Sequence, residues 1–106
     1  MSKSIAVGGL SQFSPSQILT GATVDWSQAN IFRANSSNGT NFSFTNAKEG
    51  QTITIKIVNN GLVDYTPVWP VGVIVSDSAI KPSRTRIYNF IKVNGIIYGN
   101  YLDIGV

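Results

Sequence analysis

The fold is decided by the C-terminal stretch 86–103, RIYNFIKVNGIIYGNYLD. Here Asn94-Gly95 stands between two runs rich in β-branched and aromatic residues, the strongest short signal for a β-hairpin with a two-residue turn. Such a turn sets the register, so Tyr88 should lie opposite Tyr101. Both faces of the hairpin are largely apolar. We therefore expect it to be covered on both sides within one domain, or to bury one face against another subunit.

The composition of the whole chain also favours strands. Val, Ile and Thr number 31, against 4 Leu and 1 Glu, and β-branched side chains suit a pleated sheet better than a helix. Within TITIKIV (52–58) the alternation is clearest, with the three isoleucines expected to point inward. Other strand-like runs, with turn residues between them, are 20–26, 31–34, 42–45 and 71–75, and 63–70 (VDYTPVWP) reads as a bent or edge strand. The sequence predicts an all-β fold, a single antiparallel β-sandwich or jelly roll at 20–106, preceded by an extended N-terminal arm at 1–19.

Several functional classes are excluded by the residues that are missing. The chain has 106 residues, no Cys and no His, so it offers no disulfide, no thiolate zinc site and no histidine-dependent triad. Its five carboxylates show no spacing typical of an acid–base pair, and no phosphate-binding or calcium loop is present. We expect no catalytic residue, no metal and no cofactor. No apolar run approaches the ~20 residues of a membrane span, and no secretory signal opens the chain, so we expect neither a membrane partner nor export.

A cluster of basic residues raises the question of nucleic acid. Four of the eight basic residues fall within 12 positions, at Lys81, Arg84, Arg86 and Lys92. If 84–93 is one strand, three of them share a face with Tyr88 and Phe90, an arrangement that could stack and neutralise a single strand. The net charge of only +3 favours the simpler interpretation, a solvated or interfacial strand.

The aromatic residues allow a second binding hypothesis. Trp69 lies between Pro67 and Pro70, at the expected end of a strand, with Tyr65 nearby. Together with Trp26 and Tyr88, these rings could form a platform that stacks on sugars. Tyr65 and Trp69 are the candidate glycan contacts. The competing interpretation is that they anchor the core or an interface.

The chain also resembles a known family. The series TGATVDW, NFSFTNAKEGQTITIKIVNNG, YTPVWP and YNFIKVNGIIYGN, over roughly residues 20–100, is similar to a small β-module of bacteriophage structural proteins. That module is found in tail fibres, head fibres and capsid decoration proteins. It often carries a second Trp-Pro-Gly-Gly segment, and this chain has VGVIV (71–75) instead.

The resemblance implies a non-enzymatic virion component, usually trimeric. A short chain of this kind suits a capsid decoration (cement) protein on the outer surface of the capsid, made in the bacterial host cytoplasm, with the major capsid protein and two further copies as partners. The alternative is a receptor- or carbohydrate-binding module of a tail or head fibre. For capsid contact we expect residues of the arm, namely Ile5, Val7, Leu10, Phe13 and Ile18. For the subunit interface we expect one face of the hairpin, namely Tyr88, Phe90, Ile97 and Tyr101.

Overall fold

The computed structural model describes residues 16–105 of the chain. Within this range it holds strands, one short 3-10 helix, η1 (Ser36–Asn38), and no α-helix, which confirms the all-β class. The strands are β2 (Ser16–Ile18), β3 (Thr23–Asp25), β4 (Ile31–Asn35), β5 (Ser43–Thr45), β6 (Thr52–Val58), β7 (Ile74–Val75), β8 (Thr85–Val93) and β9 (Ile96–Ile104).

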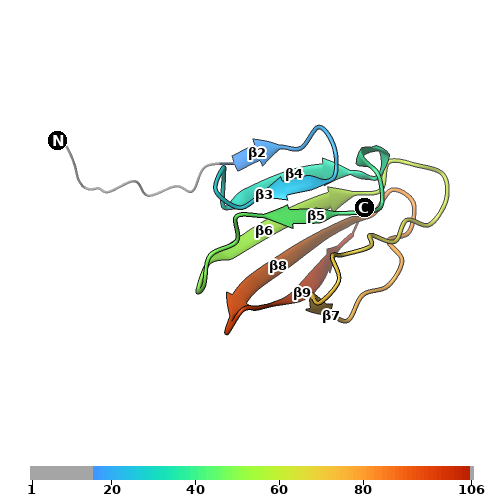
Figure 1. The fold of residues 1–106 in the computed structure, drawn as a ribbon. Coiled ribbons are helices and arrows are strands. Elements are labelled where there is room, and N and C mark those ends of the chain that lie inside the picture. Colours follow the sequence, from blue (N-terminus) through green and yellow to red (C-terminus); the bar gives the residue numbers. More distant parts are fainter. Residues whose placement is uncertain (1–15, 106) are drawn as a thin grey trace.

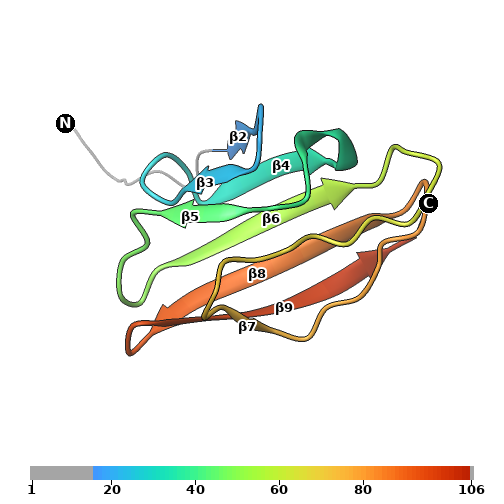
Figure 2. The ribbon, with the colours of Figure 1, turned by 45° about the vertical axis from the view of Figure 1, so that its right-hand side comes forward.

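The strands form two sheets. Six of them make one large sheet in the order β2-β4-β6-β8-β9-β7, and β3 pairs with β5 in a small sheet (Figures 1 and 2). The antiparallel arrangement expected from the sequence holds only for β6–β8 and β8–β9. The pairs β2–β4, β4–β6, β3–β5 and β7–β9 are parallel. The chain alternates between the two sheets from β2 to β6, so each strand re-enters its sheet in the same direction, as in a solenoid.

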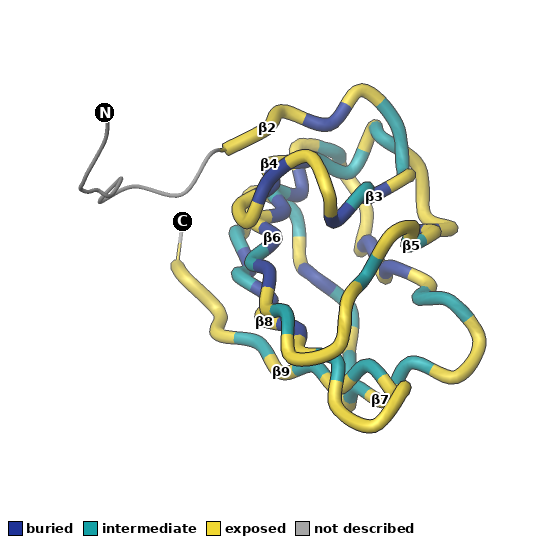
Figure 3. Tube along the Cα trace, turned by 60° about the vertical axis from the view of Figure 1, so that its left-hand side comes forward, coloured by how far each residue is buried: buried dark blue, intermediate teal, exposed yellow. Residues whose placement is uncertain are grey.

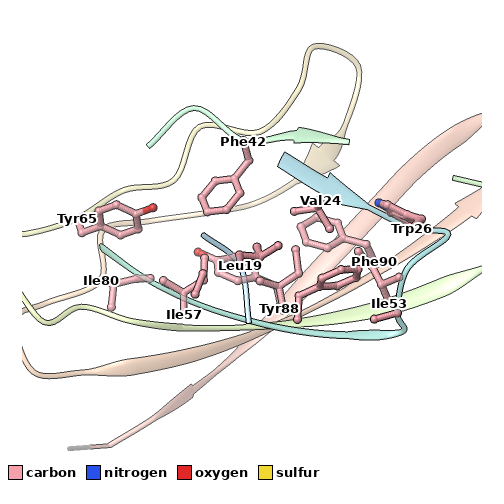
Figure 4. Close-up of a cluster of buried hydrophobic side chains, with 14 residues drawn as sticks. Leu19, Val24, Trp26, Phe42, Ile53, Ile57, Tyr65, Ile80, Tyr88 and Phe90 are labelled. Carbon is pink, nitrogen blue, oxygen red and sulfur yellow. The ribbon is translucent and has the colours of Figure 1, made fainter. Parts of the chain in front are cut away.

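The core lies between the two sheets, whose strands form opposite walls around the buried positions in Figure 3. The predicted alternation of β6 is confirmed, because Ile53, Ile55 and Ile57 are at most 2% exposed while Thr52 and Lys56 face solvent. Figure 4 shows the aromatic rings that fill the space above these isoleucines. We call the side of the large sheet that faces the core the inner face, and the opposite side the outer face.

The predicted hairpin register is confirmed. Residue Tyr88 pairs with Tyr101 and Phe90 with Gly99 along β8 and β9. At the turn, Asn94 and Gly95 have φ values of 52° and 77°, the positive φ at both central positions that a type I′ turn requires.

The segment between β6 and β8 departs from the prediction. No buried strand spans 71–75, because only Ile74–Val75 pairs with β9 and the side chain of Val71 is fully exposed. A turn replaces the expected strand start, with the amide of Val73 donating to the carbonyl of Pro70 at 3.1 Å. Upstream, 63–70 forms no continuous strand, and Tyr65 makes a single antiparallel bridge to Ile80.

At the N-terminal end, the expected arm overlaps the sheet. Strand β2 pairs with β4, the side chain of Leu19 is 7% exposed, and its amide donates to the carbonyl of Arg33 at 2.8 Å. Residues 16–19 therefore belong to the two-layer structure, and residues 1–15 lie outside the described range.

Candidate functional site

The inner face of the hairpin is part of the core. Tyr88 and Phe90 are 0% and 1% exposed within the single chain. The ring of Trp69 lies over both, with centroid distances of 4.9 Å and 4.8 Å. Ile97 and Tyr101, on the same face of β9, are partly buried against this core. The chain's own 59–80 segment and small sheet therefore cover Tyr88 and Phe90, while Ile97 and Tyr101 remain partly exposed. The subunit interface expected at these four residues stays a prediction.

A buried ion pair holds the covering segment to the hairpin. Arg86, 3% exposed, donates from Nη1 to Asp77 at 2.8 Å and from Nε to Asp103 at 2.6 Å. Asp77 also accepts hydrogen bonds from the Trp69 indole at 2.8 Å and from the Tyr88 hydroxyl. One carboxylate of the 59–80 segment thus joins the tryptophan above the sheet to the arginine within it.

The environment of this network raises the pKa values of two of its members, Arg86 and Tyr88. Burial alone would lower the pKa of Arg86, but hydrogen bonds to Asp103 and Tyr88 outweigh it and raise the pKa above its usual range. Burial raises the pKa of the Tyr88 phenol, and the hydrogen bond to Asp77 adds to the shift. Both groups therefore keep their protons at neutral pH, and their hydrogen bonds to Asp77 hold the 59–80 segment to the hairpin.

The basic and aromatic residues that the sequence placed on one face of a strand do lie together on β8, but on the face that points into the core. Residues Arg86, Tyr88, Phe90 and Lys92 do share one face of β8, as the sequence predicts. That face is the inner one, so the rings are unavailable for base stacking and the guanidinium of Arg86 is occupied by carboxylates. The geometry does not support a nucleic-acid site on this strand.

Of the candidate glycan contacts, Tyr65 is buried and Trp69 is partly buried against the core. Tyr65 is 6% exposed, its hydroxyl donates to the carbonyl of Gly39, and burial raises its pKa to about 12. Trp69 stacks on Phe42 at 4.9 Å between ring centroids and contacts three further aromatic rings. These two side chains act as core anchors, which was the competing interpretation of the sequence.

The outer face of the hairpin is exposed and apolar. It carries the odd-numbered residues of β8 and the even-numbered residues of β9, and Ile74 of β7 lies beside them. Its large hydrophobic side chains are between 37% and 61% exposed, and they are Ile74, Ile91, Val93, Ile96, Tyr98, Leu102 and Ile104. The sequence identified both faces of the hairpin as apolar and placed these residues together on one of them, but the predicted subunit contact used the other face. Among the described residues, this face carries most of the exposed apolar side chains on regular strands, with Ile18 of β2 and Ile31 of β4 as further members.

The remainder of the outer face is mainly polar, with Ile31 of β4 and Ile18 of β2 as its exposed apolar side chains. A row of Thr54, Asn89 and Asn100 crosses β6, β8 and β9, with the Thr54 hydroxyl donating to Asn89 at 2.9 Å. Farther along the same face, Arg33 of β4 lies beside Lys56 of β6 and adds two positive charges. The outer face therefore has an uncharged apolar end over β7, β9 and β8 and a cationic end over β4 and β6.

The expected arm contacts can be placed only in part. Ile18 is 63% exposed on the edge strand β2. The other four, Ile5, Val7, Leu10 and Phe13, lie outside the described residues.

Residues 16–105 show little evidence of a metal site, a ligand pocket or a membrane-spanning helix. No group of three or more metal-ligating side chains occurs there. An open hollow of about 280 Å³ lies between Lys81, Arg84 and Ile104, but the Arg86 guanidinium on its wall is already engaged by Asp103. In the same part of the chain, no helix has the length and apolarity needed to cross a membrane.

Comparison of the chain with family models, with curated proteins and with solved structures finds no match. Any functional conclusion therefore depends on the geometry above and on the resemblance of the sequence.

Proposed function

We propose that this protein is a structural component of a bacteriophage virion, a capsid decoration (cement) protein that binds the shell of major capsid protein as a homotrimer. The observation that carries the proposal is the exposed apolar outer face of the hairpin, because contiguous apolar surface on regular strands is typical of a protein–protein contact. The resemblance of the sequence to phage β-modules supplies the context. The same proposal takes the two sheets as a β-sandwich, with β3, β5 and the 59–80 segment as the second layer.

The mechanism of such a protein is binding linkage. A ligand that binds only the assembled shell stabilises that state in proportion to its occupancy, and needs no reactive group to do so. The two-layer domain would expose its outer face to a protein partner, and the arm residues Ile5, Val7, Leu10 and Phe13 would contact the capsid protein. We propose the outer surface of the capsid as its location.

The test is the copy number of this chain in purified phage particles, measured by quantitative mass spectrometry against the major capsid protein. The proposal predicts a ratio approaching one copy per capsid protein, as a shell-wide cement requires. A ratio of a few per cent would instead favour a tail or head fibre with a receptor-binding role. Absence from the particles would overturn the assignment to the virion.

A further inference from the structure

We propose that the outer face of the C-terminal hairpin, and not its inner face, is the surface through which copies of this chain associate. This inference rests on the proposed function, since it names a contact between copies of the chain. A face that meets the same face of a second copy has two-fold symmetry, so the mass measured below also distinguishes a dimer from the proposed trimer. The occupant of the face is a second copy of the chain.

The apolar side chains of this face form two groups on either side of the Asn89–Asn100 pair. Ile74, Ile91, Val93, Ile96 and Tyr98 lie towards the turn, and Leu102 and Ile104 lie towards the other end of the hairpin. Strand pairing places Ile74 beside Tyr98 and Tyr98 beside Ile91, which joins three adjacent strands in one row. Val93 and Ile96 pair at the turn. Of the exposed hydrophobic residues elsewhere, Leu62 and Val71 lie on the 59–80 segment, and Ile18 and Ile31 lie singly on β2 and β4. A partner that covers the outer face of β7, β8 and β9 would therefore need a flat surface of similar area.

The charge pattern favours an identical partner. No outer-face position of β8 or β9 carries a charged side chain. A chain with net charge +3 can therefore bring this end against its own copy without placing like charges in contact. The charged pair Arg33 and Lys56 lies on β4 and β6 of the same face, and Lys56 pairs with Ile87 beside the apolar strands. An acidic partner would be expected to prefer the surface around these two cations, not the uncharged strands.

The polar residues within the contact are compatible with self-association. Asn89 and Asn100 pair across β8 and β9, and both are exposed. Each carboxamide carries both donor and acceptor atoms, so it can satisfy the same group in another copy. A row of this kind leaves no buried charge when two copies meet.

The size of the surface is adequate. Seven side chains at these exposures offer on the order of 500 Å² of apolar area, near the upper end for the largest patch on a monomer. With the asparagine row included, the face approaches the ~800 Å² that each partner contributes to a standard interface.

The test is sedimentation equilibrium of the full chain from about 1 to 100 μM. The wild-type chain should show a multiple of the 11.4 kDa monomer mass. The double variant Ile96→Lys/Leu102→Lys should dissociate, with the dissociation constant raised about 100-fold or more, because each copy would bring new positive charge to the contact. The two positions are 40% and 61% exposed in the single chain, so the lysine ammonium groups can stay in water and the fold should survive.

The matched control is Leu62→Lys/Val71→Lys, which adds the same two charges at residues that are fully exposed on the 59–80 segment. It should leave the mass unchanged. Circular dichroism melting curves of all three proteins check that each is folded. A monomeric wild-type chain at every concentration, or a folded double variant that still associates like the wild type, would overturn the inference.

This outcome is separable from that of the proposed function. If the wild-type chain is monomeric and the double variant loses binding to phage shells, the outer face contacts the capsid protein instead, and only the inference on self-association fails. If the chain associates through this face but is absent from phage particles, only the virion assignment fails.

Discussion

At the scale of single residues, Gly99 decides which face of the hairpin can be internal. A Cβ added to it would lie 2.5 Å and 2.6 Å from two carbon atoms of the Phe90 ring. Phe90 cannot move away cheaply, because it is 1% exposed and its ring packs against Trp69 and Phe44. The aromatic ring thus lies over the glycine of the neighbouring strand, and together they fill the inner layer.

We therefore predict that Gly99→Ala lowers the free energy of unfolding by about 1–3 kcal/mol, the usual cost of forcing an extra methyl group into a packed core. Gly21→Ala is the matched control, since a Cβ there meets no atom within 4 Å, and its effect should stay within about 0.5 kcal/mol. Urea unfolding of both variants measures the difference. Equal stability of the two variants would show that the packing around Phe90 is looser than described.

Arg86 provides a second test at this scale, because it is a buried cation between Asp77 and Asp103. Arg86→Met removes the charge and leaves Asp77, 12% exposed, without its cation. We expect a loss of about 3–5 kcal/mol of unfolding free energy, as for other broken buried ion pairs. Lys81→Met breaks the exposed pair with Asp64 and should cost at most about 1 kcal/mol. A loss below 1 kcal/mol for the Arg86 variant would contradict its role as the clamp of the 59–80 segment.

At the scale of elements, the tip of the hairpin is held by a carboxylate from another turn. Glu49 accepts hydrogen bonds from the backbone amides of Gly95 at 3.0 Å and Asn94 at 2.5 Å. These bonds, that of Gly95 first, lower the pKa of Glu49 below its ordinary value of 4.5. A lowered folded-state pKa means that the carboxylate stabilises the fold above pH 4.5, and that this contribution is lost as the pH falls through the folded-state pKa.

Glu49→Gln should therefore lower the thermal midpoint at pH 7, and the difference from wild type should shrink as the pH is lowered towards 3. Hydrogen bonds from Asn46 and Ser27 also lower the pKa of Asp25, but this residue is present in both proteins and cancels in the comparison. Thermal melting at a series of pH values measures the effect. A constant difference at all pH values would contradict the assignment of the cap to the ionised carboxylate.

Local pattern was sufficient to predict some elements and not others. The register of β8 and β9 and the alternation of β6 follow from a two-residue turn and from period two, both of which are local. The parallel pairs β2–β4 and β4–β6 depend on crossovers through the small sheet, which no local pattern encodes. The prediction of a buried strand at 71–75 was wrong. The apolar run VGVIV indicated burial, but Pro70 and Gly72, which has a φ of 92°, form a turn there.

The candidate site illustrates the same limit. The sequence identified two apolar faces on the hairpin and predicted the aromatic one as the subunit contact. No local pattern shows which face the rest of the chain covers, since aromatic and aliphatic rows are equally apolar. The choice depends on Trp69 and Phe44, which pack on Phe90 from distant parts of the chain. Once these rings are in place, the tyrosine–phenylalanine row is internal and the isoleucine–valine–leucine row is left outside.

At the scale of the whole molecule, the two faces of the large sheet have different roles. The inner face makes a self-sufficient core with the small sheet and the 59–80 segment (Figure 3). The outer face contributes nothing to that core and exposes apolar side chains on three neighbouring strands. Exposed apolar surface on regular strands promotes aggregation unless a partner covers it. We propose that a second copy of the same chain covers it.

The most direct test of this central claim uses the absence of cysteine from the sequence, which allows single cysteines to be introduced. Asn100→Cys places a thiol in the middle of the outer face, and Val71→Cys places one on the exposed loop over the inner face. With a short bismaleimide at low protein concentration, we predict that the Asn100 variant gives mainly covalently linked pairs on a denaturing gel while the Val71 variant gives unlinked chains. Equal, low yields of linked pairs for both variants would contradict the claim that copies of the chain meet through the outer face.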